Sequence, residues 1–259
     1  MKEKTTVSVK LAPVAAVLLL LGIWQIVCVA GWIPSYMLPS PVEVVAAFCG
    51  DFPLLMYHAG ISLSEAFLGL FSAVAIGFLL AFLMERFPLI YHAFYPLLVI
   101  TQTVPVVAVA PLLVLWFGYG ILPKVILILL IAFFPVVVGL LDGFRTADED
   151  TVLLLKTMGA TPWQVFRHLR LPASLPHFFS GLRIAVTYSV VGAVIAEWLG
   201  GFGGLGVYMT RVKSAYAYDK MFAVIFLITV ISLLLIAFVH VLERKVMPWK
   251  NPKESEEQK

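Results

Sequence analysis

The sequence predicts an all-α integral membrane protein with about six transmembrane helices and one polar two-helix loop. Hydrophobic residues make up 61% of the 259 residues and charged residues only 13%, whereas a soluble domain contains about a quarter charged residues. The mean hydropathy is +1.00. Apolar stretches close to the ~20 residues that cross a bilayer recur along the chain. We place them at 11–31, 59–84, 89–117, 121–143, 177–200 and 220–242.

The first stretch, 11–31, is expected to remain in the protein as a span, because its apolar run exceeds the ~7–15 residues of a signal-peptide core. A proline-rich connector follows from Ile33 to Pro41, and residues 42–49 are expected to form a short interfacial helix. Cys28 is expected inside the span and Cys49 outside it, which argues against a disulfide between them. We therefore divide the chain into three parts, which are an N-terminal span with its outer connector (1–58), a membrane core (59–242) and a charged tail (243–259).

The second stretch carries a row of small residues that predicts a helix-packing face. These residues lie four positions apart, a spacing that lets another helix approach closely; they are Gly69, Ala73, Gly77 and Ala81. Glu65 lies near the outer end of the same stretch. We expect Glu65 to be solvated at the membrane interface, and a role in transport is the alternative.

The third stretch, 89–117, is interrupted by Pro96, Pro105 and Pro111. Broken helices are tolerated in a membrane where they are buried in protein or line a cavity. Gln102 offers hydrogen bonds at membrane depth within this stretch. It either bonds to a neighbouring helix or contacts the substrate, and the sequence leaves both possibilities open.

The fifth stretch repeats the small-residue spacing, and its next step lands on an acid. The row consists of Gly181, Ala185, Ser189, Ala193 and Glu197. Because this spacing drifts by about 40° per step on an ideal helix, only neighbours such as Ala193 and Glu197 share a face securely. Glu197 is therefore expected to face packed protein or a wet cavity, where intramembrane acids usually point, or else to lie at the outer interface. Trp198 beside it fits either an aromatic belt or a ligand contact.

Residues 201–206, Gly-Phe-Gly-Gly-Leu-Gly, match the spacing G-x-G-x-x-G. A dinucleotide-binding fingerprint needs a preceding β-strand and a βαβ unit, whereas this motif follows a membrane span. We reject a cofactor role. The glycines are expected to let the chain turn sharply before a short interfacial helix at 205–217.

The polar segment 145–176 is expected to contain two short helices joined by a tight turn. Asp148 to Asp150 favour a helix start, because the helix dipole stabilises negative charge there, and Gly159 favours its end. Thr161 can cap a second helix in a capping box with Gln164. Pro172 predicts that this second helix ends near Arg170. Such an exposed pair of helices has the character of a docking device.

The distribution of basic residues predicts that both termini and the 145–176 segment are cytoplasmic. Cytoplasmic loops carry an excess of Lys and Arg. Of the 18 basic residues, only Lys124, Arg211, Lys213 and Lys220 would lie on the outer side in this arrangement. The same bias explains the net charge of +3 without any nucleic-acid partner.

Several kinds of chemistry lack a sequence signature. The five histidines show no metal-binding spacing, and a Walker A sequence is absent, so the chain cannot bind ATP by that device. An intramembrane enzyme would need two titratable groups that converge at depth, and the sequence offers mainly Glu197. A passive channel would leave the docking segment unexplained. Neither class is favoured.

Short motifs in the polar segment resemble the "EAA" loop of permease subunits in binding-protein-dependent ABC importers. They are Met158-Gly159-Ala160-Thr161, Phe166 and Leu171-Pro172-Ala173-Ser174-Leu175-Pro176. Other segments resemble the nitrate/sulfonate/taurine type of these permeases; they are Leu38–Pro41, Pro111–Gly120, Phe133–Pro135, Ala196–Trp198 and Gly204–Gly206. The chain departs from the family pattern in one place, because Leu153-Leu154-Leu155 replaces Glu-Ala-Ala.

This resemblance implies a type I ABC importer permease (MetI-like) fold in a bacterial or archaeal cell membrane. It implies that the loop sits in a groove of a cytoplasmic ATPase subunit, which binds ATP and Mg²⁺ while this chain holds no cofactor or metal. The other implied partners are an extracytoplasmic solute-binding protein and a second copy of the chain. The expected ATPase-coupling residues are Met158, Gly159, Ala160, Thr161, Pro162, Trp163, Gln164, Phe166 and Arg167, with Trp163 and Phe166 as apolar anchors.

The resemblance also bears on the substrate. The run from His177 to Ser189 is similar to branch members that handle heterocyclic vitamins or their precursors, such as the thiamine pyrimidine or riboflavin. An anion such as a sulfonate, taurine or nitrate is the alternative, although the spans contain almost no Lys or Arg. Candidate residues of the translocation path are Gln102, Tyr188, Glu197 and Trp198.

Overall fold

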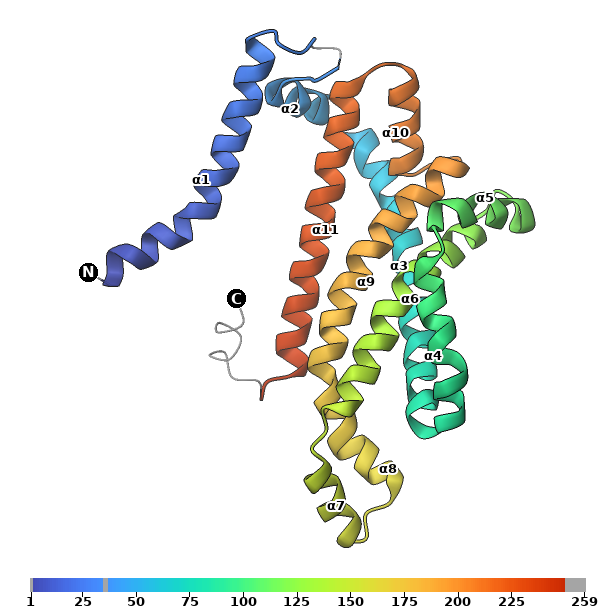
Figure 1. Ribbon diagram of the computed structural model, residues 1–259. Coiled ribbons are helices and arrows are strands. Elements are labelled where there is room, and N and C mark those ends of the chain that lie inside the picture. The colour runs from blue at the N-terminus through green and yellow to red at the C-terminus, as the bar shows by residue number, and fades with distance from the viewer. Residues whose placement is uncertain (1, 35–36, 250–259) are drawn as a thin grey trace.

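The computed structural model describes residues 2–34 and 37–249, with side chains from Ala12 onward except Pro13. The part of the predicted charged tail from 250 to 259 and two residues of the outer connector, 35 and 36, lie outside the described residues. The described residues form helices joined by short turns (Figure 1). In chain order these are α1 (Lys2–Val29), α2 (Pro41–Gly50), α3 (Phe52–Arg86), α4 (Pro88–Thr103), α5 (Val106–Phe117), α6 (Ile121–Arg145), α7 (Glu149–Thr157), α8 (Pro162–Val165), the π-helical turn η1 (Phe166–Arg170), α9 (Leu171–Leu199), α10 (Leu205–Ser214) and α11 (Tyr218–Val246).

Three helices, α3, α6 and α9, form the centre of the bundle, and α6 packs against both of the others. The two predicted rows of small residues are buried at these contacts. A Cβ atom at Gly69 would lie 2.4 Å from Cγ2 of Ile128, and one at Gly181 would lie 2.2 Å from the carbonyl oxygen of Pro135. The small residues therefore let the helix backbones approach closely, as the sequence predicted.

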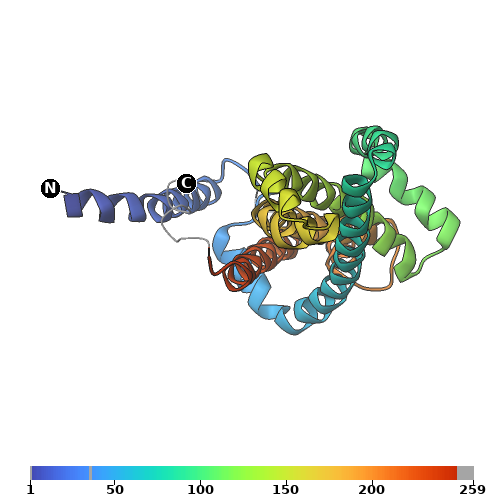
Figure 2. The same cartoon turned by 90° about the horizontal axis from the view of Figure 1, so that it is seen from below.

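Within the described residues, four helices are long and apolar enough to cross a membrane, and a bent pair would make a fifth. These four are Phe52–Arg86, Ile121–Arg145, Pro162–Leu199 and Tyr218–Val246. The described part of the first predicted span contributes a shorter apolar helix, Val14–Val29. In both views α1 projects away from the bundle (Figures 1 and 2).

The third predicted stretch, 89–117, is not one straight helix. It consists of α4 and α5, which are bent by 100° relative to each other. Val104 at the break has extended backbone angles, as the residue before a proline prefers. Pro105 has no N–H to continue the helix. The bend therefore follows directly from this proline, and Gln102 lies just before it.

The helix that begins at Pro162 does not end near Arg170, so this prediction was wrong. It continues without a break through η1 into α9, and the whole helix spans Pro162–Leu199. Leu171 donates its N–H to the carbonyl of Phe166, five residues earlier. A π turn is wider than an α turn, which relieves the clash between the ring of Pro172 and the carbonyl four residues before it.

The two ends of the bundle carry different short helices. The α7–α8 segment lies at one end, and α2 and α10 lie at the opposite end (Figure 1). Both interfacial helices predicted from the sequence are present, since α2 covers Pro41–Gly50 and α10 covers Leu205–Ser214. Both cysteines are free.

Candidate functional site

The first half of the polar loop has the predicted caps. Asp148 accepts a hydrogen bond of 3.1 Å from the N–H of Thr151 at the start of α7. The Thr151 hydroxyl and then its N–H lower the pKa of the Asp148 carboxyl. At the other end Gly159 has φ +84°, and its N–H donates to the Lys156 carbonyl while that of Ala160 donates to Leu155. This is a Schellman motif, in which a left-handed glycine satisfies the last carbonyls of the helix.

The second half begins with the predicted capping box. The N–H of Gln164 donates to Oγ1 of Thr161 at 3.3 Å, and the N–H of Thr161 donates to Oε1 of Gln164 at 2.7 Å. Pro162 occupies the first helical turn, where its missing N–H costs nothing. Local sequence therefore determines both helices and the turn between them.

The loop presents an apolar outer surface. Trp163 is 57% exposed, and Met158 and the two leucines Leu153 and Leu154 are also exposed. The leucines stand where the family pattern has Glu-Ala-Ala. Of the other predicted coupling residues, Gly159, Thr161, Pro162, Gln164 and Arg167 are exposed and Ala160 is half-buried. Exposed apolar side chains on a polar segment indicate a contact surface.

Phe166 points into the bundle, unlike Trp163. It is 8% exposed, and its ring centroid lies 4.9 Å from that of Phe82 on α3 and 5.5 Å from that of Phe144 on α6. The two expected apolar anchors stack on each other with ring centroids 5.7 Å apart, but they differ in exposure. Trp163 faces outward, whereas Phe166 fixes the loop to the spans of its own chain.

A polar contact reinforces this connection. Arg170 in η1 donates to Oε1 of Glu85 on α3. These two residues, with Phe82 and Trp163, line a groove of about 430 Å³ between α3 and the α7–α8 segment. The loop therefore contacts α3 and is continuous with α9.

The four candidate path residues do not share one environment. Tyr188 and Trp198 lie on the exposed stripe of α9, together with Ile184 and Val191. Gln102 is exposed in the last turn of α4. Glu197 is 1% exposed and faces packed protein. No observation in the structure tests substrate contact by these residues, so their role in the path stays a prediction.

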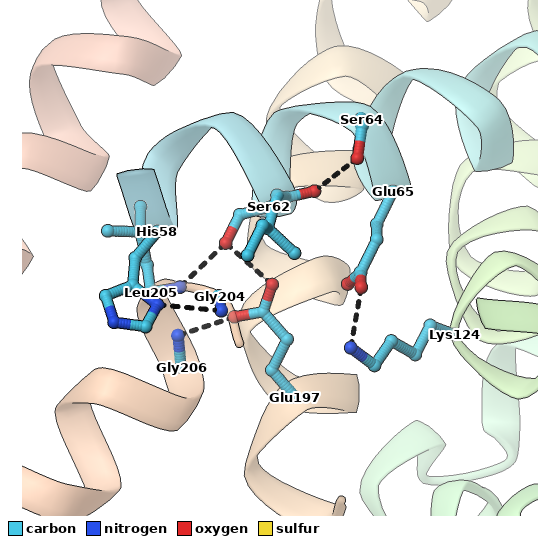
Figure 3. A network of polar contacts seen from close by, with 10 residues as sticks. His58, Ser62, Ser64, Glu65, Lys124, Glu197, Gly204, Leu205 and Gly206 are labelled. Carbon is cyan, nitrogen blue, oxygen red and sulfur yellow. Dashed lines mark hydrogen bonds and ion pairs between the residues drawn. The ribbon is translucent and has the colours of Figure 1, made fainter. Parts of the chain in front are cut away.

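Glu197 belongs to a buried polar network at the end of the bundle opposite the loop (Figure 3). Its carboxylate accepts a hydrogen bond of 2.6 Å from the hydroxyl of Ser62 and one of 2.6 Å from the N–H of Gly206. Ser62 also accepts from the N–H of Leu205 at 2.8 Å, and Nδ1 of His58 accepts from the N–H of Gly204 at 3.0 Å. Side chains of α3 and α9 therefore cap the start of α10.

This network explains the glycine motif. The N-cap of α10 is Gly204, which has no capping side chain and has φ +118°. The first N–H groups of a helix need acceptors, and the positive end of its dipole favours a carboxylate. A Cβ atom at Gly204 would lie 2.2 Å from Cδ of Glu197, and one at Gly206 would lie 2.4 Å from the Val194 carbonyl oxygen. The glycines make room for an internal carboxylate and not for a cofactor.

Glu65 is buried in an ion pair, so the prediction of a solvated acid was wrong. Nζ of Lys124 donates to Oε1 of Glu65 at 2.6 Å, and the two side chains are 7% and 6% exposed. A signal for this was present in the sequence, because Glu65 precedes Gly69 by four residues and so continues the face that packs on α6. A charge buried at such a face requires a partner.

His58 and Ser62 were missed by the sequence analysis. They lie 146 and 135 residues from their partners Gly204 and Glu197, so no local pattern marks them. Among the residues that the structure describes, no group of three or more His, Cys, Asp or Glu side chains could hold a metal ion.

Comparison with known proteins identifies the family. Residues 73–248 match the family model of the binding-protein-dependent transport system inner membrane component. The formylaminopyrimidine transport permease protein ThiX of Halalkalibacterium halodurans is 39% identical over 241 residues, which cover 93% of this chain and 96% of ThiX. The taurine transport system permease protein TauC of Escherichia coli (strain K12) is 30% identical over 237 residues, 89% of this chain and 86% of TauC.

The fold is also that of a solved transporter. An inward-facing structure of the MetNI methionine ABC transporter matches with a TM-score of 0.67 and 19% identity, over 76% of this chain and 98% of the other. At this identity the match supports the fold alone. The family match covers most of the chain and includes the capped loop and the buried acid. The chain therefore belongs to the binding-protein-dependent transport system inner membrane components, and it is a multi-pass permease subunit of an ABC importer.

Proposed function

We propose that this permease imports a small heterocyclic nutrient, with a pyrimidine precursor of thiamine as the best candidate. The observation that carries this proposal is the similarity to ThiX, a formylaminopyrimidine transport permease protein, at 39% identity over 93% of the chain. TauC, a taurine permease, is less similar at 30%.

The charges within the bundle support a substrate without negative charge. Three basic side chains on α6, α9 and α11 are paired with acids; the pairs are Lys124–Glu65, Arg183–Glu243 and Lys220–Asp51. A path for an anion would need cations that are free to replace its hydration. The paired state of these cations favours a neutral or aromatic substrate, although an anion such as taurine or another sulfonate is the alternative.

We place the α7–α8 segment in the cytoplasm, where it docks on the ATPase subunit. This placement follows from the basic residues of the sequence, which put both termini on the same side. The exposed Trp163 and Met158 supply the apolar contact, and ATP and Mg²⁺ are bound by the partner. A second copy of the chain completes the translocation path.

Transport then follows from a shift between two states. Binding of ATP to the partner changes the relative free energies of an inward-open and an outward-open arrangement, and it does so only by its differential affinity for the two. Movement of the α7–α8 segment shifts α9, because α8 continues into α9. It also shifts α3, because Phe166 and Arg170 contact α3.

Reconstitution with the partners tests the proposal. The permease, its ATPase and its binding protein are placed in proteoliposomes, and ATP hydrolysis is measured with the binding protein loaded with formylaminopyrimidine, riboflavin or taurine. We expect the pyrimidine to give the largest stimulation and to accumulate in the lumen. Stimulation by taurine alone would establish the anion importer instead. If no ligand stimulates hydrolysis, the importer assignment of this complex fails. Turnover of a substrate by the permease alone would indicate an enzyme, and ATP-independent flux would indicate a channel.

A further inference from the structure

Glu197 lies at the far end of the same continuous helix that carries the loop. The helix Pro162–Leu199 contains 38 residues, so at 1.5 Å per residue it is about 57 Å long. It begins with α8 at one end of the bundle and ends with the last turn of α9 at the other (Figure 1). Trp163 lies in its first turn and Glu197 in its last turn. One helix therefore joins the two ends of the molecule.

The covalent connection from this helix to α10 is weak as a mechanical link. It consists of residues 200–204, Gly-Gly-Phe-Gly-Gly, and glycine has the most backbone freedom of any residue. A movement of α9 would be absorbed by such a linker before it reached α10. A stiff connection has to come from side chains.

The carboxylate of Glu197 provides that connection. One oxygen accepts from the N–H of Gly206 in the first turn of α10, and the other accepts from the hydroxyl of Ser62 on α3, each at 2.6 Å. Ser62 in turn accepts from the N–H of Leu205. Short hydrogen bonds to a carboxylate are about twice as strong as those between neutral groups, and burial protects them from competition by water.

We propose that Glu197 is a positioning residue that makes α10 move together with the helix Pro162–Leu199. Movement of the α7–α8 segment at one end of the bundle then displaces α10 at the other end. This inference rests on the proposed role of that segment in coupling, and it assigns Glu197 a function inside the protein and not on the substrate. The residue is needed because it makes two hydrogen bonds, one to each neighbouring element.

Two substitutions separate this role from a general effect on stability. Glu197→Gln keeps an acceptor for Gly206 and turns its amide toward Ser62, which can accept from it. Glu197→Ala removes both bonds. The matched control is Ser189→Ala on the same helix, because the buried hydroxyl of Ser189 bonds only to the Val186 carbonyl of its own helix.

The first readout is the amount of substrate imported per ATP hydrolysed in proteoliposomes. We expect this ratio to fall about tenfold in Glu197→Ala, the size that loss of a charge-assisted hydrogen bond predicts. The ratio in Glu197→Gln and in Ser189→Ala should stay within about twofold of the wild-type ratio. A change of this size is smaller than the loss of one such hydrogen bond would cause. An unchanged ratio in Glu197→Ala would overturn the proposal, and so would an equal loss in Glu197→Gln and Glu197→Ala.

The second readout is the position of α10. Spin labels are attached to Val191→Cys on α9 and Lys213→Cys on α10 after both native cysteines are replaced by serine; both chosen positions are exposed. We expect one narrow distance distribution in the wild type, with and without trapped nucleotide, and a broad one in Glu197→Ala. Equally narrow distributions in both proteins would contradict the proposal that Glu197 holds α10 to α9.

The outcomes distinguish the inference from the proposed function. If the wild-type complex shows no stimulation of ATP hydrolysis by any loaded binding protein, the proposed function fails. If the wild type is stimulated and Glu197→Ala imports with the same ratio, only the inference fails. Should Glu197→Ala not assemble, Glu197→Leu tests the same joint, because it fills a similar volume but has no acceptor for Gly206 or Ser62, and an unchanged import ratio in that variant would overturn the proposal.

Discussion

Tyr208 on α10 donates a hydrogen bond of 2.5 Å to Asp51, the residue at which α2 ends and α3 begins. Lys220 at the start of α11 pairs with the same carboxylate at 2.8 Å. Four helices therefore meet at one acid. This contact fixes the second turn of α10, directly after the turn that the Glu197 network caps.

The Tyr208–Asp51 contact should make the stability of this end depend on pH. Hydrogen bonds from Lys220 and then Tyr208 lower the pKa of Asp51 below 3.8, so its contribution is present above about pH 3.8 and is lost as the pH falls further. Burial, and then the bond to Asp51, raise the pKa of Tyr208 above 10.0. Its contribution is therefore present below about pH 10 and is lost as the pH rises through the folded pKa.

We expect Tyr208→Phe to lower the unfolding free energy by about 1.5–3 kcal/mol between these limits, the cost of one lost hydrogen bond to a charged group. The difference from the wild type should shrink above about pH 10. Thermal unfolding in detergent across the pH range measures this. The control is Tyr216→Phe, since Tyr216 is exposed; an equal effect of the two substitutions would show that the contact does not stabilise α10.

The ion pair between Arg170 and Glu85 should matter more for coupling than for stability. Both side chains are partly exposed, and such pairs contribute about 1 kcal/mol or less. We expect Glu85→Arg to reduce ATP-driven uptake and the charge-swapped double variant Glu85→Arg/Arg170→Glu to restore part of it. A double-mutant cycle of uptake rates measures the interaction. Arg86→Ala is the neighbouring control, because its guanidinium lies over the Phe87 ring; purely additive effects would argue against a functional pair.

The turn between α7 and α8 should require glycine at position 159. Gly159→Pro removes the N–H that bonds to Lys156 and cannot adopt φ +84°, so hydrolysis should continue without uptake. Gly159→Ala is milder, because a left-handed residue with a side chain costs about 1–2 kcal/mol, and we expect partial uncoupling. Gly31→Ala is a matched control, since Gly31 also has positive φ, open space around it and an N–H bonded three residues back, but it follows α1. Normal uptake in Gly159→Pro would show that this turn does not couple the subunits.

Phe166 and Trp163 should give opposite results when truncated. Phe166 is buried against Phe82 and Phe144, so Phe166→Ala should lower the unfolding free energy by about 3–5 kcal/mol. Trp163→Ala, at an exposed position, should leave the melting temperature of the isolated permease close to that of the wild type. It should instead weaken binding of the ATPase subunit in a pull-down. Normal ATPase binding by Trp163→Ala would exclude it as an anchor.

Local features of this protein could be predicted from the sequence because their causes lie within a few residues. Asp148, Gly159, Thr161 and Gln164 occupy the predicted caps, since a cap needs only a side chain and an N–H three residues away. The rows of small residues on α3 and α9 identified packing faces, because helical periodicity determines which side chains share a face. Of the three prolines expected to interrupt 89–117, only Pro105 breaks the helix, whereas Pro96 and Pro111 lie inside α4 and α5.

The prediction that the second loop helix ends at Arg170 failed because it considered only the residue before Pro172. A π turn, which no propensity signals, carries the helix through and makes the loop continuous with α9. The solvated environment predicted for Glu65 failed for a different reason. Its partner Lys124 lies on another helix, and the pairing depends on how α3 and α6 pack.

The sequence by itself therefore determined the membrane class, the two-helix loop, its caps and the faces by which α3 and α9 pack. Only the tertiary structure decided the environment of Glu197, because the sequence left it either facing packed protein or a wet cavity or lying at the outer interface. Its acceptor bonds join Ser62, 135 residues away, to the start of α10. The physical reason is that propensity, capping and periodicity act along the chain, whereas the partner of a buried charge is whichever group the packing of distant helices brings within hydrogen-bonding distance.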